Sequence, residues 1–319
     1  MSVMRHQGHG CNNGAMEYAL QTIGNTYAEY LEAARWAEAK GLTAFAIPDH
    51  YIYGTSDEAL SRPAYDAFAV MAGLARETET IELVVLVSPI TFRHPAVLAK
   101  NAATIQEMAG GRFKLGVGTG WLEQEHSRFG IDFPATGERF ARTEEALAYL
   151  RAAFAEPPVA FSGEFYSLEA FDIQPRPPLR LVVGGTGAVK TPRLAGTYAD
   201  ELNAYPALPE EYEAKIDRAR DAAVAAGRDP EALLISSSGQ IVAAETEREY
   251  RDKVTEIAAE TKTDPEELEA EAAKRNTPRG TWQQVREILA GMAEAGMSRF
   301  YFQGGFDPED IELKLGKLT

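Results

Sequence analysis

The chain has 319 residues, of which 45% are hydrophobic and 25% charged, proportions typical of a globular protein with a sizeable core. Its 48 acidic residues outnumber its 32 lysines and arginines, and the net charge of −16 disfavours nucleic acid and anionic membranes as partners. The single cysteine, Cys11, excludes an intramolecular disulfide and a cysteine-rich metal site.

Residues 1–15 are rich in Gly, His and Asn, and we expect a disordered leader there, followed by a single domain over residues 16–319. The leader lacks the apolar segment of a signal peptide, and no run of about 18 apolar residues follows, so we expect a cytoplasmic protein. The spacing of His6, His9 and Cys11 could ligate a metal, but nothing around them would fix the geometry. We therefore expect no metal site.

From residue 16 onward, short β-rich runs alternate with longer helical runs. The expected strands are 16–22, 43–47, 81–87, 112–117, 179–183, 201–203, 233–243 and 298–303. The expected helices are 26–40, 63–77, 95–108, 138–154, 191–198, 210–226, one or two over 247–274, and 281–296.

About eight strand–helix units match an α/β fold of the (β/α)8 TIM-barrel type. The continuous apolar strands fit a parallel sheet that is covered on both faces. The charged segment 247–274 is then a helical insertion before the last strand–helix units. A doubly wound sheet is the alternative, because periodicity alone does not separate the two architectures.

In such a barrel the catalytic groups lie at the C-terminal ends of the strands. Asp49 and His50 directly follow the expected strand 43–47. Histidine is suited to proton transfer near neutral pH, and a neighbouring carboxylate can orient a partner or a cofactor. We therefore favour His50 as a catalytic residue over a structural histidine. His94 and His126 stand near helix starts, where we expect capping or a surface position.

The run 116–120 (GVGTG) closes a strand but fails the dinucleotide-binding pattern, because Trp121 stands where a further glycine belongs. These glycines would instead let a flat cofactor approach the backbone. Trp121 could line that pocket or belong to the core. Glu125, on the same loop, is a candidate acid or base, although most such glutamates are solvated. Ser88, at the end of the third strand, could donate to a bound ring or simply end the strand.

A second glycine-rich turn, 184–187 (GGTG), follows the buried strand 179–183 and precedes a helix. Backbone N–H groups in such a turn bind anions, and barrels often bind phosphate through their later loops. We favour a cofactor phosphate site here over a plain helix-entry turn.

The run 88–100 (SPITFRHPAVLAK), with 102–104 (AAT), 110–113 (GGRF) and 115–121 (LGVGTGW), resembles the bacterial luciferase-like oxidoreductases, and most of all their coenzyme F420-dependent branch. Shorter matches are 129–134 (FGIDFP), 138–140 (ERF), 184–187 and 198–203. The resemblance extends from about residue 16 to residue 303, and the long run is its specific part.

The resemblance implies a flavin or deazaflavin ring at the C-terminal mouth of a (β/α)8 barrel. It implies that His50 is the proton donor or acceptor near the ring, that Asp49 contacts the deazaflavin, and that an often cis peptide near Val85–Leu86 supports the ring. Together with the residues above, the expected cofactor site comprises Asp49, Val85, Leu86, Ser88, Gly120, Trp121, Gln124, Gly184, Gly185, Thr186, Gly187 and Ala188.

One position departs from the family pattern. The family's sugar-phosphate dehydrogenases carry a glutamate immediately after Gly-Thr-Gly, as a second catalytic group, where this chain has Trp121. The departure puts glucose 6-phosphate in doubt as the substrate and leaves Glu125 as a weak substitute for that second group.

The function so predicted is hydride transfer between coenzyme F420 and a small organic substrate, in a homodimer. The alternative is a luciferase-like monooxygenase that uses reduced FMN and oxygen. A cofactor-binding protein without turnover is disfavoured, because a mere binder has no need of a titratable His50 at the ring.

Overall fold

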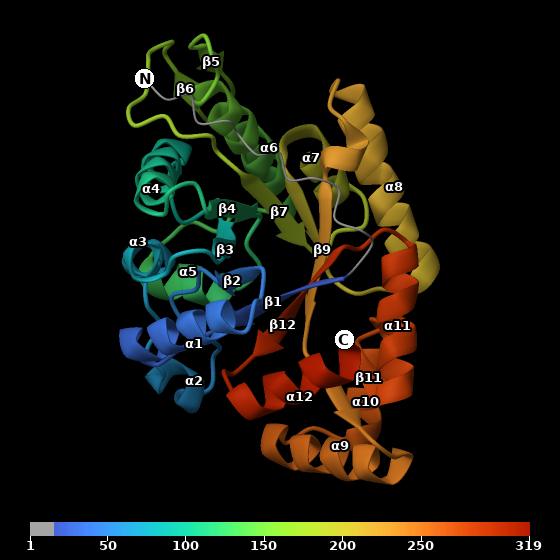
Figure 1. Ribbon diagram of the computed structural model, residues 1–319. Coiled ribbons are helices and arrows are strands. Elements are labelled where there is room, and N and C mark those ends of the chain that lie inside the picture. Colours follow the sequence, from blue (N-terminus) through green and yellow to red (C-terminus); the bar gives the residue numbers. More distant parts are fainter. Residues whose placement is uncertain (1–15) are drawn as a thin grey trace.

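The computed structural model describes residues 16–319 and folds them into a closed barrel of parallel strands surrounded by helices (Figure 1). β1 pairs with β2 on one side and β12 on the other, which closes the sheet. The barrel strands, in chain order, are β1 (Glu17–Thr22), β2 (Ala44–Ile47), β3 (Glu82–Pro89), β4 (Phe113–Gly118), β7 (Leu181–Gly185), β8 (Glu201–Ala204), β9 (Leu234–Gly239) and β12 (Arg299–Gly304).

This closed sheet confirms the predicted (β/α)8 barrel and excludes the doubly wound alternative. The helices are α1 (Tyr27–Ala39), α2 (Asp57–Ser61), α3 (Ala67–Glu77), α4 (Pro95–Met108), α5 (Glu123–Phe129), α6 (Thr136–Ala153), α7 (Lys190–Tyr198), α8 (Pro209–Ala225), α9 (Glu247–Thr261), α10 (Pro265–Lys274), α11 (Trp282–Glu294) and α12 (Pro308–Leu318). No helix within residues 16–319 is long and apolar enough to cross a membrane. The expectations for the leader and for His6, His9 and Cys11 lie outside the described residues.

Local signals explain where the helices begin and end. The Thr26 side chain caps α1 by accepting from the Glu29 N–H, and Gly41, with a φ of +74°, follows its end. His94 caps α4, its ring Nδ1 accepting from the Ala96 N–H, and Pro95 occupies the first turn. The capping predicted for His94 is therefore confirmed.

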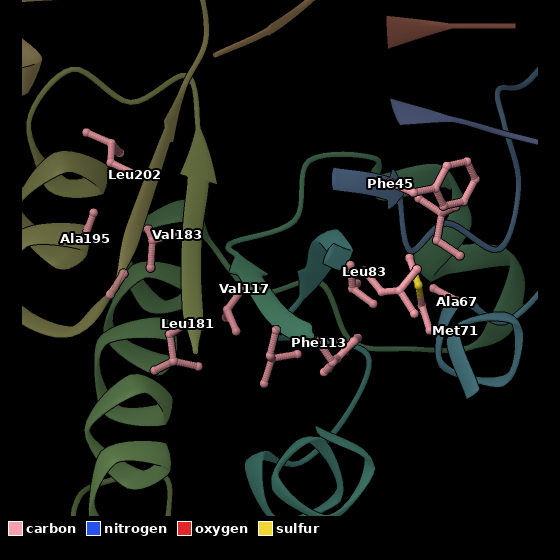
Figure 2. Packing of buried hydrophobic residues seen from close by; sticks show 14 of the residues in the cluster. Phe45, Ala67, Met71, Leu83, Phe113, Val117, Leu181, Val183, Ala195 and Leu202 are labelled. Carbon is pink, nitrogen blue, oxygen red and sulfur yellow. The ribbon is translucent and has the colours of Figure 1, made fainter. Parts of the chain in front are cut away.

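The main hydrophobic core lies between the strands and the helices (Figure 2). Alternate strand residues such as Phe45, Leu83 and Phe113 point outward and are at most 1% exposed. They pack against residues such as Met71 of α3 and Ala195 of α7. Burying one such large side chain contributes about 1.5–3 kcal/mol, so this layer supplies much of the stability.

The interior of the barrel holds smaller side chains than the outer core between the strands and the helices. Its apolar cluster consists mostly of small and β-branched residues: Ala19, Ala44, Ala46, Val84, Leu86, Val182 and Tyr301, with Val87 packed against them. These residues alternate along the strands with the outward-facing core, as the two-residue strand period requires. The narrow interior therefore holds short side chains near its middle and leaves the two ends to polar groups.

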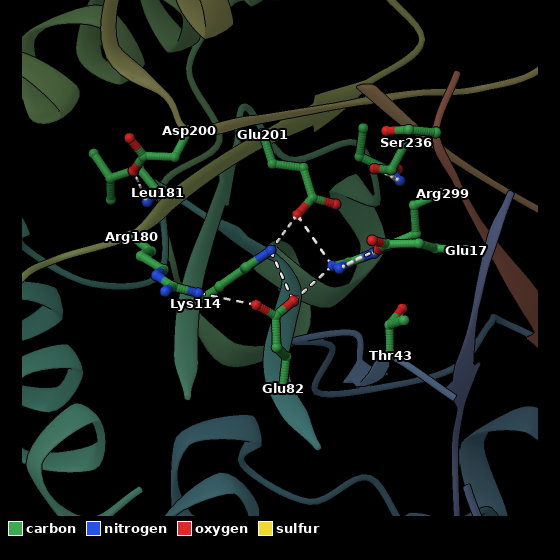
Figure 3. A network of polar contacts seen from close by, with 12 residues as sticks. Glu17, Thr43, Glu82, Lys114, Arg180, Leu181, Asp200, Glu201, Ser236 and Arg299 are labelled. Carbon is green, nitrogen blue, oxygen red and sulfur yellow. Dashed lines mark hydrogen bonds and ion pairs between the residues drawn. The ribbon is translucent and has the colours of Figure 1, made fainter. Parts of the chain in front are cut away.

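A network of charged side chains fills the N-terminal end of the barrel (Figure 3). Glu82 contacts Lys114 at 2.9 Å, Arg180 at 2.9 Å and Arg299 at 2.8 Å. Glu201, which is completely buried, pairs with the same Lys114 at 2.9 Å. Burial alone would raise the pKa of Glu82, but Lys114 and Arg299 outweigh that effect and lower it to about 2.

The structure corrects several expected boundaries. The expected helix 63–77 begins only at Ala67, where the Asp66 side chain caps it, and the short α2 precedes it. The expected strand 233–243 is two strands, β9 and β10 (Val242–Ala244). β10 pairs with β11 (Arg279–Thr281) outside the barrel, and α9 and α10 form the predicted helical insertion between them. The hairpin of β5 (Phe161–Ser162) and β6 (Ser167–Leu168) was not predicted.

Candidate active site

Asp49 and His50 lie just beyond the last residue of β2, at the C-terminal end of the barrel. The Asp49 side chain is completely buried. It accepts a hydrogen bond from the Ser88 hydroxyl at 2.7 Å and forms an ion pair with Arg93. Burial raises the pKa of Asp49, and Arg93 and Ser88 oppose that rise. Asp49 thus ties the end of β2 to the end of β3, and its carboxylate faces protein groups.

His50 forms a pair with Glu125, which comes from α5. The His50 Nδ1 lies 3.1 Å and 3.2 Å from the two carboxylate oxygens, and the Tyr51 backbone N–H donates to the same carboxylate at 3.1 Å. Glu125 is completely buried, whereas the His50 side chain is 18% exposed. With Nδ1 donating to Glu125, Nε2 is left for a bound molecule, since none of the hydrogen bonds among the described residues involves it.

α5 carries the residues that fix this pair. Next to Glu125, His126 is also completely buried, with Nδ1 2.9 Å from the Leu122 carbonyl oxygen and Nε2 2.6 Å from the Thr91 hydroxyl. The carbonyl accepts from Nδ1–H, so Nε2 accepts from Thr91. The expectation of a capping or surface position for His126 was therefore wrong: this histidine anchors α5 to the loop after β3.

The other expected residues of this loop are exposed. Trp121 exposes 73% of its surface and meets the His50 ring edge-on, with 5.8 Å between ring centroids and 78° between ring planes. It is thus at the barrel mouth and does not belong to the core. Gln124 is exposed on α5. Gly120 has a φ of +76°, a left-handed conformation that only glycine adopts freely.

The end of β3 packs against glycines of the neighbouring strands β4 and β7. The peptide between Leu86 and Val87 is cis, one residue beyond the expected position. Val85 points into the outer core and Leu86 into the barrel interior. A Cβ built on Gly118 would lie 2.7 Å from a Val87 methyl group, and one on Gly184 would lie 3.0 Å from the other methyl group. The missing side chains at Gly118 and Gly184 thus make room for the Val87 side chain at the C-terminal end of the barrel.

The turn 184–188 separates β7 from α7. Gly185 has a φ of +153°, and a Cβ on Gly187 would lie 2.6 Å from the Thr191 hydroxyl oxygen. No side chain caps the N-terminus of α7, so its first N–H groups are not taken by a cap, and Thr186 and Ala188 are exposed beside them. Uncapped N–H groups at a helix N-terminus suit a phosphate, and the residues present therefore fit a phosphate-bearing ring cofactor.

Sequence reasoning missed two residues of this region. Arg93, which holds Asp49, lies in the run 88–100, but nothing in that run indicated a partner 44 positions earlier. Gln21 of β1 is 5% exposed and donates from Nε2 to the Leu86 carbonyl oxygen at 2.8 Å, while its Oε1 is buried without a partner among the described residues. Its inward position in a predicted strand could have identified it. Residues 16–319 contain no His, Cys, Asp and Glu group arranged to hold a metal ion.

The chain matches the luciferase-like monooxygenase family over residues 4–299. This match spans most of its length, and the chain belongs to that family.

The relatives of the chain are oxidoreductases of two kinds. An F420-dependent glucose-6-phosphate dehydrogenase of Kineococcus radiotolerans is 32% identical over 219 residues, which are 62% of this chain and 64% of the relative. An FMNH2-dependent dimethylsulfone monooxygenase of Pseudomonas putida is 27% identical over 63% of this chain and 55% of the relative. These matches thus span less than two thirds of either relative.

The fold has a close counterpart among solved structures. An F420-dependent secondary alcohol dehydrogenase, in complex with an F420-acetone adduct, superposes with a TM-score of 0.75 over 96% of this chain and 99% of the other, at 22% identity. The family therefore includes both F420-dependent and FMN-dependent members on this barrel.

Proposed function

We propose that this protein is an oxidoreductase that transfers a hydride between coenzyme F420 and a small organic substrate, with His50 as the proton donor or acceptor. The observation that carries the proposal is the His50–Glu125 pair at the C-terminal end of the barrel. A histidine held by a buried carboxylate through one ring nitrogen presents the other nitrogen in a fixed orientation, and the carboxylate stabilises the imidazolium once that nitrogen takes a proton.

The chemistry divides between the cofactor and the chain. When bound, F420 supplies the acceptor or donor of the hydride, that is, of both electrons. His50 supplies the proton: in the oxidation of an alcohol, Nε2 accepts the hydroxyl proton as the carbon loses its hydride, and a carbonyl compound results. In the reverse direction the His50 imidazolium returns the proton to the carbonyl oxygen. Glu125 accepts from Nδ1 and so holds the orientation of the ring.

Two parts of the chain would hold the cofactor. The turn 184–188 and the uncapped start of α7 would bind its phosphate through backbone N–H groups. The ring would lie at the C-terminal end of β3, beside Val87 and the cis peptide that precedes it. F420 is the first cofactor to test, because the F420-dependent relative matches 62% of this chain at 32% identity.

A binding titration followed by turnover tests the proposal. The protein is titrated separately with F420 and with FMN, and binding is followed through the absorbance and fluorescence of each cofactor. We expect F420 to bind. Under nitrogen, an alcohol should bleach the visible absorbance of oxidised F420, and a carbonyl compound should restore it from reduced F420. Tight binding of FMN, no binding of F420 and oxygen consumption with reduced FMN would place the protein among the monooxygenases instead.

A Gly187→Val variant tests the phosphate site, with Gly137→Val as its control. The added Cβ would lie 2.6 Å from the Thr191 hydroxyl oxygen, so either Thr191 in the first turn of α7 or the glycine-rich turn must shift. We expect the Kd for F420 to rise at least tenfold. A Gly137→Val variant, in which the added Cβ meets nothing within 4 Å, should bind F420 like the wild type.

A further inference from the structure

Trp121 is exposed to a degree that its surroundings do not explain. It exposes 73% of its surface, whereas Trp282 exposes 5% and Trp36 is partly covered by Phe306. Tryptophan buries more area than any other side chain when it is covered, so an open indole leaves a large apolar surface in water. What distinguishes Trp121 from the other exposed apolar residues is its contact with the His50 ring at the mouth of the barrel.

The backbone holds this indole in place. Gly120 adopts a left-handed conformation, and a Cβ there would lie 3.3 Å from both the Pro89 Cβ and the Thr91 hydroxyl oxygen. Leu122, on the other side of Trp121, is 6% exposed and begins α5. The backbone of Trp121 is thus held between a left-handed glycine and a buried leucine, although its own side chain is exposed.

The indole stands beside the nitrogen that would exchange the proton. The two rings are in edge-to-face contact at 5.8 Å, within the range of attractive aromatic pairs. Glu125 occupies the His50 Nδ1, so a substrate would bind at Nε2 of a ring whose neighbour is the indole. The rest of that substrate therefore extends along an aromatic surface.

The charges around His50 disfavour an anionic substrate. Arg93 lies over the Tyr51 ring, 5.7 Å from its centroid, but its guanidinium is already bound by Asp49 and Asp66. The nearest charge to His50 is the buried carboxylate of Glu125. A phosphate or carboxylate at this place would meet a negative charge, and the one arginine beside it is already engaged.

We propose that Trp121 forms one wall of the substrate pocket and selects uncharged alcohols or carbonyl compounds that carry a flat apolar group, such as an aromatic ring, stacked on the indole. This inference rests on the proposed function, because it assumes that His50 exchanges the proton of that substrate.

The experiment compares acetophenone, cyclohexyl methyl ketone and acetone on the protein loaded with reduced F420, and glucose 6-phosphate on the protein loaded with oxidised F420. Binding is measured by calorimetry and turnover by the change in F420 absorbance. We expect acetophenone to bind about tenfold more tightly than cyclohexyl methyl ketone, which has a similar size but no flat ring, and glucose 6-phosphate to bind most weakly.

Three variants test whether the Trp121 indole itself contributes to acetophenone binding or whether any change at the surface weakens binding of all probes. Trp121→Ala should weaken acetophenone binding about tenfold and change acetone binding less than about twofold, while Trp121→Phe should retain most of the acetophenone affinity. Phe171→Ala is the matched control, because Phe171 is also an exposed aromatic residue, at 56%, and has no contact with His50. It should behave like the wild type.

Different outcomes of this experiment would contradict the inference about Trp121 and the proposed function. Turnover of glucose 6-phosphate with F420, or equal losses for all probes in Trp121→Ala, would overturn the inference and leave the F420-dependent activity standing. Trp121-dependent binding of acetophenone without any F420 turnover would overturn the proposed function and support the apolar wall. Absence of acetophenone binding to the wild type would overturn the inference directly.

Discussion

At the N-terminal end of the barrel, Glu82, Lys114, Glu201 and Arg299 neutralise one another through short contacts. At the C-terminal end, polar groups are only half engaged: His50 uses one ring nitrogen, and Gln21 uses its amide nitrogen but not its oxygen. The same strands contribute to both ends, so the difference is not one of fold.

This contrast separates stability from function. Buried charges that satisfy each other keep the end of the barrel closed, and removing one leaves its partners uncompensated. Buried polar groups that lack a partner cost stability and persist where a bound molecule completes them. Mutations at the two ends should therefore affect different measurements.

The largest effect is expected for His50→Asn. The asparagine amide can still donate to Glu125 in place of Nδ1, but it has no group to exchange a proton, so turnover should fall by about 10²–10⁴-fold. The F420 Kd and the urea midpoint should stay close to those of the wild type. His94→Asn, in a helix cap, serves as the control and should keep full turnover. A His50→Asn protein with more than a tenth of the wild-type turnover would contradict the assignment.

The opposite pattern is expected for Glu201→Ala. Lys114 and Arg299 would lose a completely buried counterion, and breaking such a network costs about 3–5 kcal/mol of the free energy of unfolding. Urea denaturation measures the loss, and turnover per folded molecule should remain within about twofold of the wild type. Glu260→Ala, on the exposed side of α9, should change neither quantity. Loss of turnover with unchanged stability would break the proposed division between the two ends.

Acid should weaken the N-terminal end through Glu82. Burial would raise the pKa of Glu82, but Lys114 and Arg299 outweigh it and lower the pKa from its ordinary value of 4.5 to about 2 in the folded protein. A lowered pKa gives stability that is complete above pH 4.5 and is lost as the pH falls towards 2, and the shift corresponds to about 3 kcal/mol. The stability difference between wild type and Glu82→Gln, from urea midpoints, should therefore shrink between pH 5 and pH 3. A constant difference would exclude this role.

A smaller effect is expected for Glu125→Gln. The amide oxygen can still accept from His50 and from the Tyr51 N–H, but it carries no charge to stabilise the imidazolium. We expect kcat to fall about 10–100-fold with little change in KM, because the loss arises only when the proton has moved. Equal changes in kcat and KM for all substrates would indicate that Glu125 only maintains the shape of the pocket.

The sequence predicted the elements better than the contacts between them. The period of apolar residues and the capping signals located the barrel strands and most helices, and the place of His50 after β2 followed from the barrel rule. The Glu125 partner did not follow, because the pair joins residues 75 positions apart. Whether a glutamate on a polar helix such as α5 points inward depends on packing, which periodicity over seven residues does not determine.

The smallest expected changes in the free energy of unfolding come from two buried glutamines, Gln106 and Gln21, which differ in how fully their amide groups are bonded. Gln106 of α4 has both amide groups bonded, to the Pro178 carbonyl oxygen at 2.9 Å and the Phe113 N–H at 2.6 Å, whereas Gln21 has a free Oε1. Gln106→Met should cost about 2 kcal/mol, because two buried backbone groups lose their partners. Gln21→Met loses one bond but also removes an unpaired oxygen, so the free energy of unfolding should change by less than about 1 kcal/mol.

The two variants should rank in the opposite order when ligand affinity is measured instead of stability. If the Gln21 Oε1 accepts a hydrogen bond from the bound cofactor or substrate, Gln21→Met should raise the Kd for one of them about fivefold, while Gln106→Met leaves both unchanged. Calorimetric titration of the two variants, with urea midpoints measured on the same samples, gives all four quantities. A Gln21→Met protein that is less stable by 2 kcal/mol or more and binds normally would place Gln21 with the structural groups, because the orphaned oxygen would then have no ligand to receive.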